Sequence, residues 1–330
     1  MYGEMMRYYG LIKDLDKADY FDTESFNKIM LSLKIAINSG GIIAFTGIVG
    51  SGKTIALRRM QQVLKEDNKV IVSKSMATDK QKVNINTLYI ALFSDLPTEK
   101  GFKIPTQPEK KERILKQVLQ KVKKPIALFI DEAHNLSHKT LIGLKHLIET
   151  VEDSNATLAI IVMGHPKLGN DLRNPSMEEI GARAKVFNLN GIGNYKRQYI
   201  EWILDKCSNP DVKPYDIITK EAIELLSERL ITPLQIAHYL TQALAKGYEA
   251  GLKPIDNDII EMVLSPDINA IGPKLARQGY NIPVLCEYLN ANCSDVRSYI
   301  QGKLSSNKTE DFNKEIQKNR FALRRERKKL

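Results

Sequence analysis

One stretch constrains the fold more than any other part of the sequence: Gly47-Ile-Val-Gly-Ser-Gly-Lys-Thr54. It fits the pattern G-x-x-x-x-G-K-[ST], in which glycines let the loop backbone turn its N–H groups around phosphates. Such a loop requires a strand before it and a helix after it. The segment 42–60 has the apolar run of a strand before the loop and the pattern of a helix after it. We therefore predict a polyphosphate-binding loop. The residues predicted to bind the nucleotide are Gly47, Ile48, Val49, Gly50, Ser51, Gly52, Lys53 and Thr54.

Short apolar segments separated by helical patterns surround this loop. Continuous apolar runs of this kind indicate strands of a parallel sheet that is covered on both faces. A helix is predicted over 22–38, where Phe26, Met30, Leu33 and Ile37 follow one apolar face. The fold class is therefore predicted to be α/β, with a P-loop parallel sheet. The predicted strands are 42–46, 70–73, 126–130, 158–163 and 186–189.

Beyond residue 192 the strand pattern gives way to helices, which are predicted over 194–206, 219–230, 233–249 and 256–264. We predict four parts: an N-terminal linker and helix (1–39), an α/β ATPase core (40–192), a helical lid (193–264) and a C-terminal helical extension (265–330). Within the extension, NIPVLCEYLNANCSDVRSYIQG fits a helix-turn-helix with Arg297 exposed. A DNA-reading helix-turn-helix and a hairpin that docks a partner both stay open.

A second polar group follows the predicted strand 126–130. Asp131 and Glu132 stand at its carboxyl end, which is where open α/β sheets bind ligands. With the P-loop upstream, Asp131 is predicted to join Thr54 around Mg²⁺, and Glu132 to act as the general base toward water. His165 follows the next strand in the chain. It is predicted either to sense the γ-phosphate or to cap the following helix.

The charge of the chain favours an acidic partner, with nucleic acid first, because the net charge is +10. Residues 99–124 hold nine Lys or Arg against three Glu, and residues 303–330 hold ten against four acids, a net +6 each. Ordinary solvated faces are the alternative. The residues predicted to contact DNA are Lys103, Lys110, Lys111 and Arg113, together with Arg324, Arg325 and Arg327 in the tail.

Cys207, Cys286 and Cys293 have no metal-ligand spacing and are predicted to be free thiols in a reducing cytosol. No apolar run approaches the roughly 20 residues of a membrane helix. The first residues lack the apolar segment of an export signal. The predicted location is therefore the cytoplasm, without a membrane partner.

Four features of the sequence together resemble a known family. They are the P-loop, the pair Asp131-Glu132, and two further segments: Gly164-His-Pro-Lys-Leu168 and EEIGARAKVFNLNGIGNYKRQYIEWIL. They resemble the AAA+ ATPases of the ExeA group, which is related to the transposition ATPases MuB, TnsC and TniB. The opening MRYYGL is similar as well, so that the resemblance covers about residues 6–250. It implies an ATP- and Mg²⁺-dependent ATPase that forms a ring or helical filament. In such an assembly, an arginine of the neighbouring subunit completes each ATP site. Arg183 matches that arginine, and Arg173 is the second candidate.

The chain departs from this family in the lid. The family carries G-x-P-R there, with an arginine facing the nucleotide, whereas RLITPLQIAHYL places Leu234 at that position and leaves Arg229 as a substitute. The resemblance and the basic charge together predict a DNA-binding oligomeric ATPase that assists a DDE transposase in target DNA selection. Two alternatives stay open: a regulatory ATPase of a secretion or pilus system, and a nucleotide-switched DNA-binding adaptor.

Overall fold

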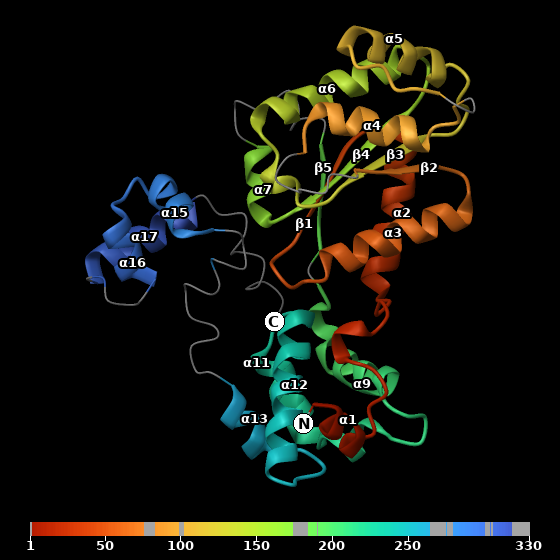
Figure 1. Cartoon of the computed structure of the whole chain (residues 1–330). Helices are drawn as coiled ribbons and strands as arrows, with labels where there is room; N and C mark the ends of the chain where they lie inside the picture. The colour runs from red at the N-terminus through yellow and green to blue at the C-terminus, as the bar shows by residue number, and fades with distance from the viewer. Residues whose placement is uncertain are drawn as a thin grey trace. The chain divides into compact units, whose positions relative to one another are not determined.

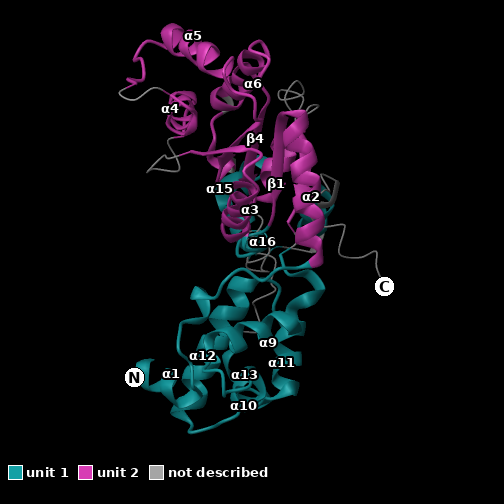
Figure 2. Ribbon diagram, turned by 90° about the vertical axis from the view of Figure 1, so that its right-hand side faces the viewer, with its two compact units in different colours: residues 1–23, 48–52, 190–330 teal, residues 24–47, 53–189 magenta. Residues whose placement is uncertain are grey.

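The structure is a computed structural model that describes residues 2–75, 83–98, 102–173, 184–189, 191–264, 275, 280–300, 304 and 306–318. Contacts divide the chain into two units (Figure 2). Unit 2 comprises residues 24–47 and 53–189 and contains the sheet. Unit 1 comprises residues 1–23, 48–52 and 190–330 and is built from helices. The tip of the P-loop, residues 48–52, therefore groups with the helical unit.

Unit 2 is organised around five parallel strands in the order β2-β3-β4-β1-β5. Each predicted strand is confirmed, with bounds that differ from the prediction by at most one residue. The prediction is clearest for the inner strands β1, β3 and β4, which are continuously apolar and buried, as a doubly covered parallel sheet requires. The edge strands β2 and β5 each contain only a short apolar pair, Ile71-Val72 and Val186-Phe187. The strands are β1 (Gly41–Thr46), β2 (Ile71–Lys74), β3 (Ile126–Ile130), β4 (Leu158–Gly164) and β5 (Lys185–Asn188).

Helices cover both faces of the sheet (Figure 1). On one face, alternate strand residues such as Leu128 and Ile160 join a core with α4 (Ile85–Asp95), α5 (Pro108–Leu119) and α6 (His138–Glu152). α2 (Glu24–Ser39) and α3 (Lys53–Asp67) cover the other face. The short helices η3 (Ala133–Asn135) and α7 (Pro166–Asp171) follow β3 and β4. The helix predicted over 22–38 is thus α2.

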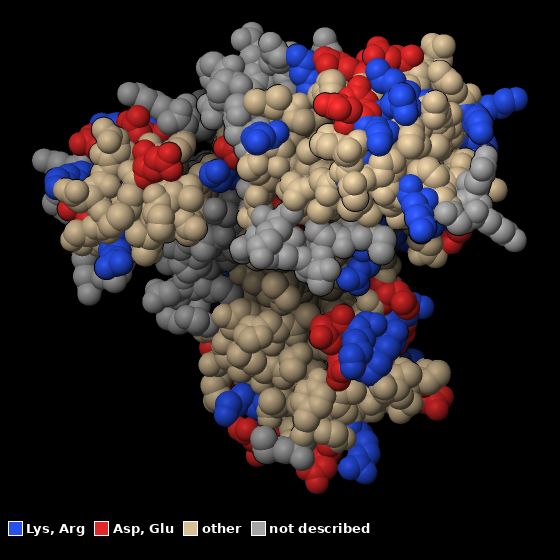
Figure 3. Space-filling model, turned by 45° about the horizontal axis from the view of Figure 1, so that its top comes forward, with Lys and Arg blue, Asp and Glu red and all other residues tan. Residues whose placement is uncertain are grey.

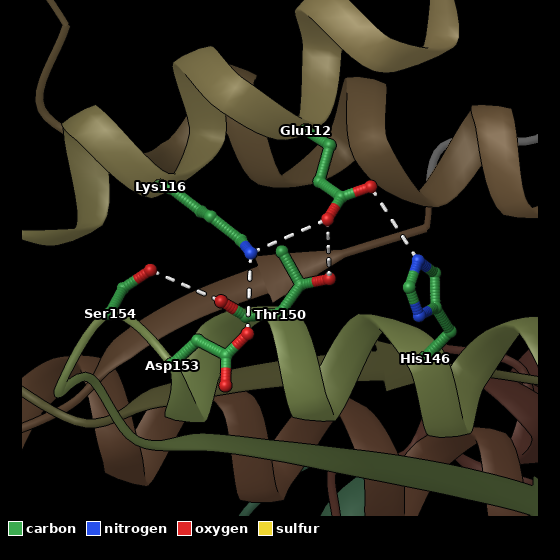
Figure 4. A network of polar contacts seen from close by, with 6 residues as sticks. All are labelled: Glu112, Lys116, His146, Thr150, Asp153 and Ser154. Carbon is green, nitrogen blue, oxygen red and sulfur yellow. Dashed lines mark hydrogen bonds and ion pairs between the residues drawn. The ribbon is translucent and has the colours of Figure 1, made fainter.

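A polar network joins α5 to α6 (Figure 4). Glu112 accepts a hydrogen bond from Thr150 over 3.4 Å, and one of its oxygens lies 3.5 Å from His146 Nε2. Lys116 Nζ lies 3.5 Å from Glu112 and 3.2 Å from Asp153. The hydrogen bond to Asp153 raises the pKa of Lys116. The network therefore turns one flank of α5, with both of its charges, toward α6.

Unit 1 contains a bundle of helices with its own apolar core. The predicted helices are present as α9 (Lys196–Cys207), α11 (Lys220–Arg229), α12 (Pro233–Glu249) and α13 (Asn257–Val263). The short η5 (Gly193–Tyr195) precedes α9, and α10 (Pro214–Ile217) lies between α9 and α11. The N-terminal α1 (Tyr2–Tyr9) and η1 (Leu15–Lys17) belong to this bundle as well. The Tyr9 hydroxyl donates to the Leu252 carbonyl over 2.9 Å. Residues 1–23 therefore belong to the helical unit, whereas α2 belongs to the unit with the sheet.

The C-terminal extension forms a small core of its own from α15 (Ile282–Tyr288), α16 (Cys293–Ile300) and α17 (Ser306–Lys318). Leu285 and Val296 are buried in it, and Asn290 has a left-handed φ of 46° in the turn between α15 and α16. The helix pair predicted there is present. In the described part of the chain, no helix is both long and apolar enough to cross a membrane.

The prediction of three free thiols is wrong for two of them. Cys286 and Cys293 form a disulfide, with Cα atoms 5.5 Å apart, because the turn after α15 brings the start of α16 back toward it. Only Cys207 is a free cysteine, and it is buried in α9, where burial raises the pKa of its thiol. Sequence spacing could not reveal the pair, since it depends on the geometry of that turn.

Candidate nucleotide-binding site

The P-loop connects β1 to α3 at the carboxyl edge of the sheet. Gly50 and Gly52 have φ values of 80° and 87°, in the left-handed region that glycine adopts without strain. The Gly47 N–H donates to the Gly164 carbonyl over 3.1 Å, which fixes the start of the loop against the end of β4. The strand–loop–helix arrangement that the motif requires is therefore present.

Lys53 is the first residue of α3 and is only 7% exposed. Its Nζ donates to the Gly47 carbonyl over 2.9 Å. Burial lowers the pKa of Lys53, and the nearby charges of Glu132 and Asp131 oppose that shift. The ammonium is thus held within the loop in a desolvated place, where a phosphate would supply the negative charge that water no longer does.

Asp131 and Glu132 follow β3 directly, at the same edge of the sheet. The Thr54 hydroxyl donates to Asp131 Oδ2 over 3.1 Å, and the Glu132 N–H donates to Asp131 Oδ1 over 2.9 Å. A hydroxyl and a carboxylate oxygen side by side fit the oxygen ligands that Mg²⁺ prefers, with phosphate and water in the remaining places. Among the described residues, no cluster of His, Cys, Asp and Glu could hold a metal by itself.

Sequence reasoning missed the backbone conformation of Glu132. Its φ of 55° and ψ of 35° are left-handed, which is uncommon for a residue other than glycine. Such strained positions occur at functional sites, where the surroundings hold them in place. The hydrogen bond from the Glu132 N–H to Asp131 holds this backbone conformation beside the site.

The comparisons with known proteins agree with this geometry. Residues 37–170 match the sequence family described as an AAA domain. The structure is similar to that of Cdc6p from Pyrobaculum aerophilum, with a TM-score of 0.51 and 16% identity over 92% of this chain and 82% of that one. The chain has the fold of a P-loop AAA+ ATPase.

Two further solved structures share this AAA+ fold. The Aeropyrum pernix ORC2 protein, in ADPNP–ADP complexes, has a TM-score of 0.55 and 13% identity over 94% of this chain and 85% of its own. The Drosophila ORC structure, bound to DNA, has a TM-score of 0.53 and 12% identity over 96% and 77%. No curated protein sequence matches the chain. The AAA+ part of the predicted resemblance is therefore confirmed, and the narrower ExeA and transposition group stays a prediction.

His165 lies where the sequence placed it, directly after the last residue of β4. It is the N-cap residue of α7, but its side chain makes no capping hydrogen bond. The residue before it, Gly164, accepts the hydrogen bond from the P-loop. His165 therefore directly follows a residue that is hydrogen-bonded to the start of the P-loop, and its γ-phosphate-sensing role stays a prediction.

The structure describes two of the three candidate arginines. Arg183 lies outside the described residues, so its role across a subunit interface stays a prediction. Arg173 is exposed just after α7. Arg229 ends α11, where its guanidinium lies 3.8 Å from Glu261 Oε1. That ion pair directs Arg229 toward the neighbouring helix α13, and its role as a substitute for the family's lid arginine stays a prediction.

The first turn of α12 touches the P-loop within unit 1. The Leu234 N–H donates to the Gly50 carbonyl over 3.3 Å. A Cβ atom on Gly50 would lie 2.9 Å from the Thr232 hydroxyl and 2.9 Å from Leu234 Cβ. Thr232 is fixed as the N-cap of α12 by a capping box with Gln235. Gly50 is therefore required both by its φ and by this close approach. Sequence reasoning found Leu234 as a departure from an arginine but missed Thr232.

Proposed function

We propose that the chain is an AAA+ ATPase that binds duplex DNA as an ATP-bound oligomer and assists a DDE transposase in choosing target DNA. The observation that carries the ATPase assignment is one group of contacts. Lys53 is held in the P-loop, Thr54 is bonded to Asp131, and Glu132 follows in a strained conformation. These are the parts that phosphoryl transfer to water requires.

Each residue has a distinct part in hydrolysis. Lys53 and the loop N–H groups bind the phosphates, and Thr54 and Asp131 hold Mg²⁺, which when bound neutralises phosphate charge. Glu132 orients the attacking water and accepts its proton as the new bond to the γ-phosphorus forms. ADP carries away the electron pair of the broken bond. His165 then senses whether the γ-phosphate is present.

Oligomerisation accounts for the assignment of Arg183. An arginine supplied by a neighbour stabilises charge in the transition state, so Arg183→Ala is expected to retain ATP binding and lose turnover. A Lys53→Ala subunit keeps Arg183 and can complete the site of its neighbour. Mixing the two inactive variants should therefore restore part of the ATPase activity. No recovery in proven mixed assemblies would contradict the assignment.

Two observations support DNA as a partner. The net charge of +10 favours a polyanion, and one structure of the same fold is a complex with DNA. In the C-terminal extension, Val296 and Tyr299 are buried and Arg297 is exposed on α16, as a DNA-reading second helix would have it. The transposase rests on the family resemblance and on this charge.

The alternatives predict different behaviour. A regulatory ATPase of a secretion or pilus system would assemble with ATP but ignore DNA. A nucleotide-switched adaptor would bind DNA and ATP without turnover, yet the chain retains Asp131 and Glu132 beside the loop. Negative-stain microscopy with a non-hydrolysable ATP analogue, with and without duplex DNA, separates these cases. We expect rings or filaments on DNA; nucleotide-dependent rings that leave DNA free would favour the secretion role.

A further inference from the structure

The outer face of α5 carries a row of polar side chains that the structure leaves exposed. The opposite face is buried through Leu115 and Leu119, and the flank with Glu112 and Lys116 is turned toward α6 (Figure 4). The helical turn continues past Leu119, since the Lys121 N–H donates to the Val118 carbonyl over 3.1 Å. We call the exposed row the α5 stripe; its members are Lys110, Arg113, Gln117, Gln120 and Lys121.

The α5 stripe carries a net positive charge. Among the residues that the structure describes, the side chains of Lys110, Arg113 and Lys121 take part in no hydrogen bond or ion pair. Of the two acids on α5, Glu112 is engaged with Lys116 and Thr150. Glu109 is exposed in the first turn, four residues before Arg113, and so lies beside that arginine on the helix surface. Three cations and two amides therefore face solvent in one row.

Lys111 does not belong to this surface. It is 7% exposed, and its Nζ donates to the side-chain oxygen of Asn86 on α4. The prediction that Lys111 contacts DNA is therefore wrong, because an inward-facing ammonium cannot reach a phosphate. The cations of α5 and its last turn therefore comprise the buried Lys111, the paired Lys116 and the three exposed cations of the stripe.

We propose that the α5 stripe binds the phosphate backbone of duplex DNA, without reading bases. This proposal rests on the DNA-binding role proposed above and names the surface for it. From Lys110 to Lys121 the row extends roughly 16 Å, at about 1.5 Å per residue. A duplex presents one negative charge about every 1.7 Å along its axis, both strands counted, so a row of this length lies opposite several phosphate charges. Lys, Arg and Gln are side chains that bond phosphate oxygens.

What the α5 stripe lacks excludes other partners. It contains no aromatic side chain on which an unpaired base could stack, as single-strand binders require. It contains no aromatic or apolar anchor of the kind that dominates protein–protein interfaces. Figure 3 shows Lys and Arg interspersed with Asp and Glu over the face drawn. A local row of one sign is therefore a more specific signal than the net charge of the chain.

The position of the α5 stripe separates it from the nucleotide. α5 leads through residues 120–125 to the amino end of β3, whereas Asp131 and Glu132 follow the carboxyl end. DNA on the stripe would therefore leave the P-loop uncovered. In an ATP-bound oligomer the stripe repeats once per subunit, so weak contacts add by multivalency, and ATP strengthens DNA binding without a new contact.

The test removes the three charges together in the full chain: Lys110→Gln, Arg113→Gln and Lys121→Gln. The matched control removes three exposed charges from unit 1 instead: Lys206→Gln, Lys213→Gln and Lys220→Gln. Both are titrated with duplex DNA by fluorescence anisotropy over a salt series, with a non-hydrolysable ATP analogue. Each lost phosphate contact lowers the log–log salt slope by about 0.9, so the stripe variant should lose up to about 2.7 per subunit. Its affinity at about 0.1 M salt should fall on the order of 10²-fold.

The outcomes separate this proposal from the function on which it rests. If the stripe variant binds DNA as the control does, the proposal is wrong and DNA binding lies elsewhere. If the unmodified chain binds no DNA, both proposals fail. Binding of single strands or polyglutamate in preference to duplex would also overturn the assignment. A charge-keeping variant (Lys110→Arg, Arg113→Lys, Lys121→Arg) should restore the slope, and both triple variants should keep ATP affinity, which shows that the site is folded.

Discussion

Two lysines of unit 2, Lys53 and Lys111, are equally buried, and each is 7% exposed. Lys53 donates to a backbone carbonyl of the P-loop and interacts electrostatically with Glu132 and Asp131. Lys111 donates to the neutral amide of Asn86. Burial of a cation is costly in both places. Lys53, however, lies beside two carboxylates and the P-loop backbone, whereas Lys111 does not. The groups around a buried cation, rather than the extent of its burial, therefore distinguish a candidate binding cation from a structural one.

Glu132→Gln is expected to have the largest effect, because it removes the proton acceptor while leaving the phosphate cradle around Lys53 intact. ATP turnover should fall by about 10²–10⁴-fold, the usual contribution of a positioned general base. ATP affinity should stay near its original value. Glu152→Gln, an exposed residue of α6, is the control. Steady-state hydrolysis and a nucleotide titration measure the two effects, and unchanged turnover would place the base elsewhere.

Lys53→Ala and Lys111→Ala test the comparison directly. The first removes a charge-assisted contact with phosphate, worth about 1.5–3 kcal/mol, so ATP affinity should fall about 10–150-fold. The second should leave ATP affinity unchanged, because Lys111 bonds Asn86 of α4. Titration with a fluorescent ATP analogue gives both constants. Equal losses in the two variants would mean that the first effect is one of folding.

The order of the two variants should be reversed for stability: Lys111→Ala should lower the free energy of unfolding more than Lys53→Ala does. Lys111→Ala removes the hydrogen bond to Asn86, which is exposed and can bond water instead, so the free energy of unfolding should fall by about 0.5–1.5 kcal/mol. Without nucleotide, Lys53→Ala should cost little, because burial lowers the pKa of Lys53 and so disfavours its charged form. Urea denaturation measures both. A double variant with Asn86→Ala isolates the pair, and additive losses there would show that the two side chains are not coupled.

The sequence predicted the parts of the molecule that depend on local pattern. The inner strands β1, β3 and β4 are buried on both faces and continuously apolar, and Gly50 and Gly52 of the P-loop have positive φ values, so these parts were found from the local sequence pattern. The remaining features depend on contacts between distant residues. Lys111 turns inward because of Asn86, and Cys286 reaches Cys293 because of a turn. The left-handed Glu132 and the approach of Thr232 to Gly50 have no sequence pattern that announces them.

The smallest expected effect concerns the lid position at which the related family has an arginine. The Leu234 N–H donates to the Gly50 carbonyl, a bond that Arg would keep, and Leu234 is 59% exposed. An arginine there could therefore extend without disturbing the loop. Leu234→Arg should raise ATP affinity about two- to fivefold, since an exposed ion pair contributes about 0.2–1 kcal/mol.

Leu234→Gln is the matched control for this prediction, because it is polar and unbranched but carries no charge. A gain in ATP affinity with Arg that Gln does not share, and that decreases at high salt, would show that a cation at position 234 can interact with the phosphates. The leucine of this chain lacks that interaction. Equal gains would assign the effect to the removal of an exposed leucine instead. A loss of affinity in both variants would mean that the leucine side chain itself supports Gly50. In that case the contact between α12 and the P-loop would be apolar, and the lid would respond to the conformation of the loop rather than to the charge of the nucleotide.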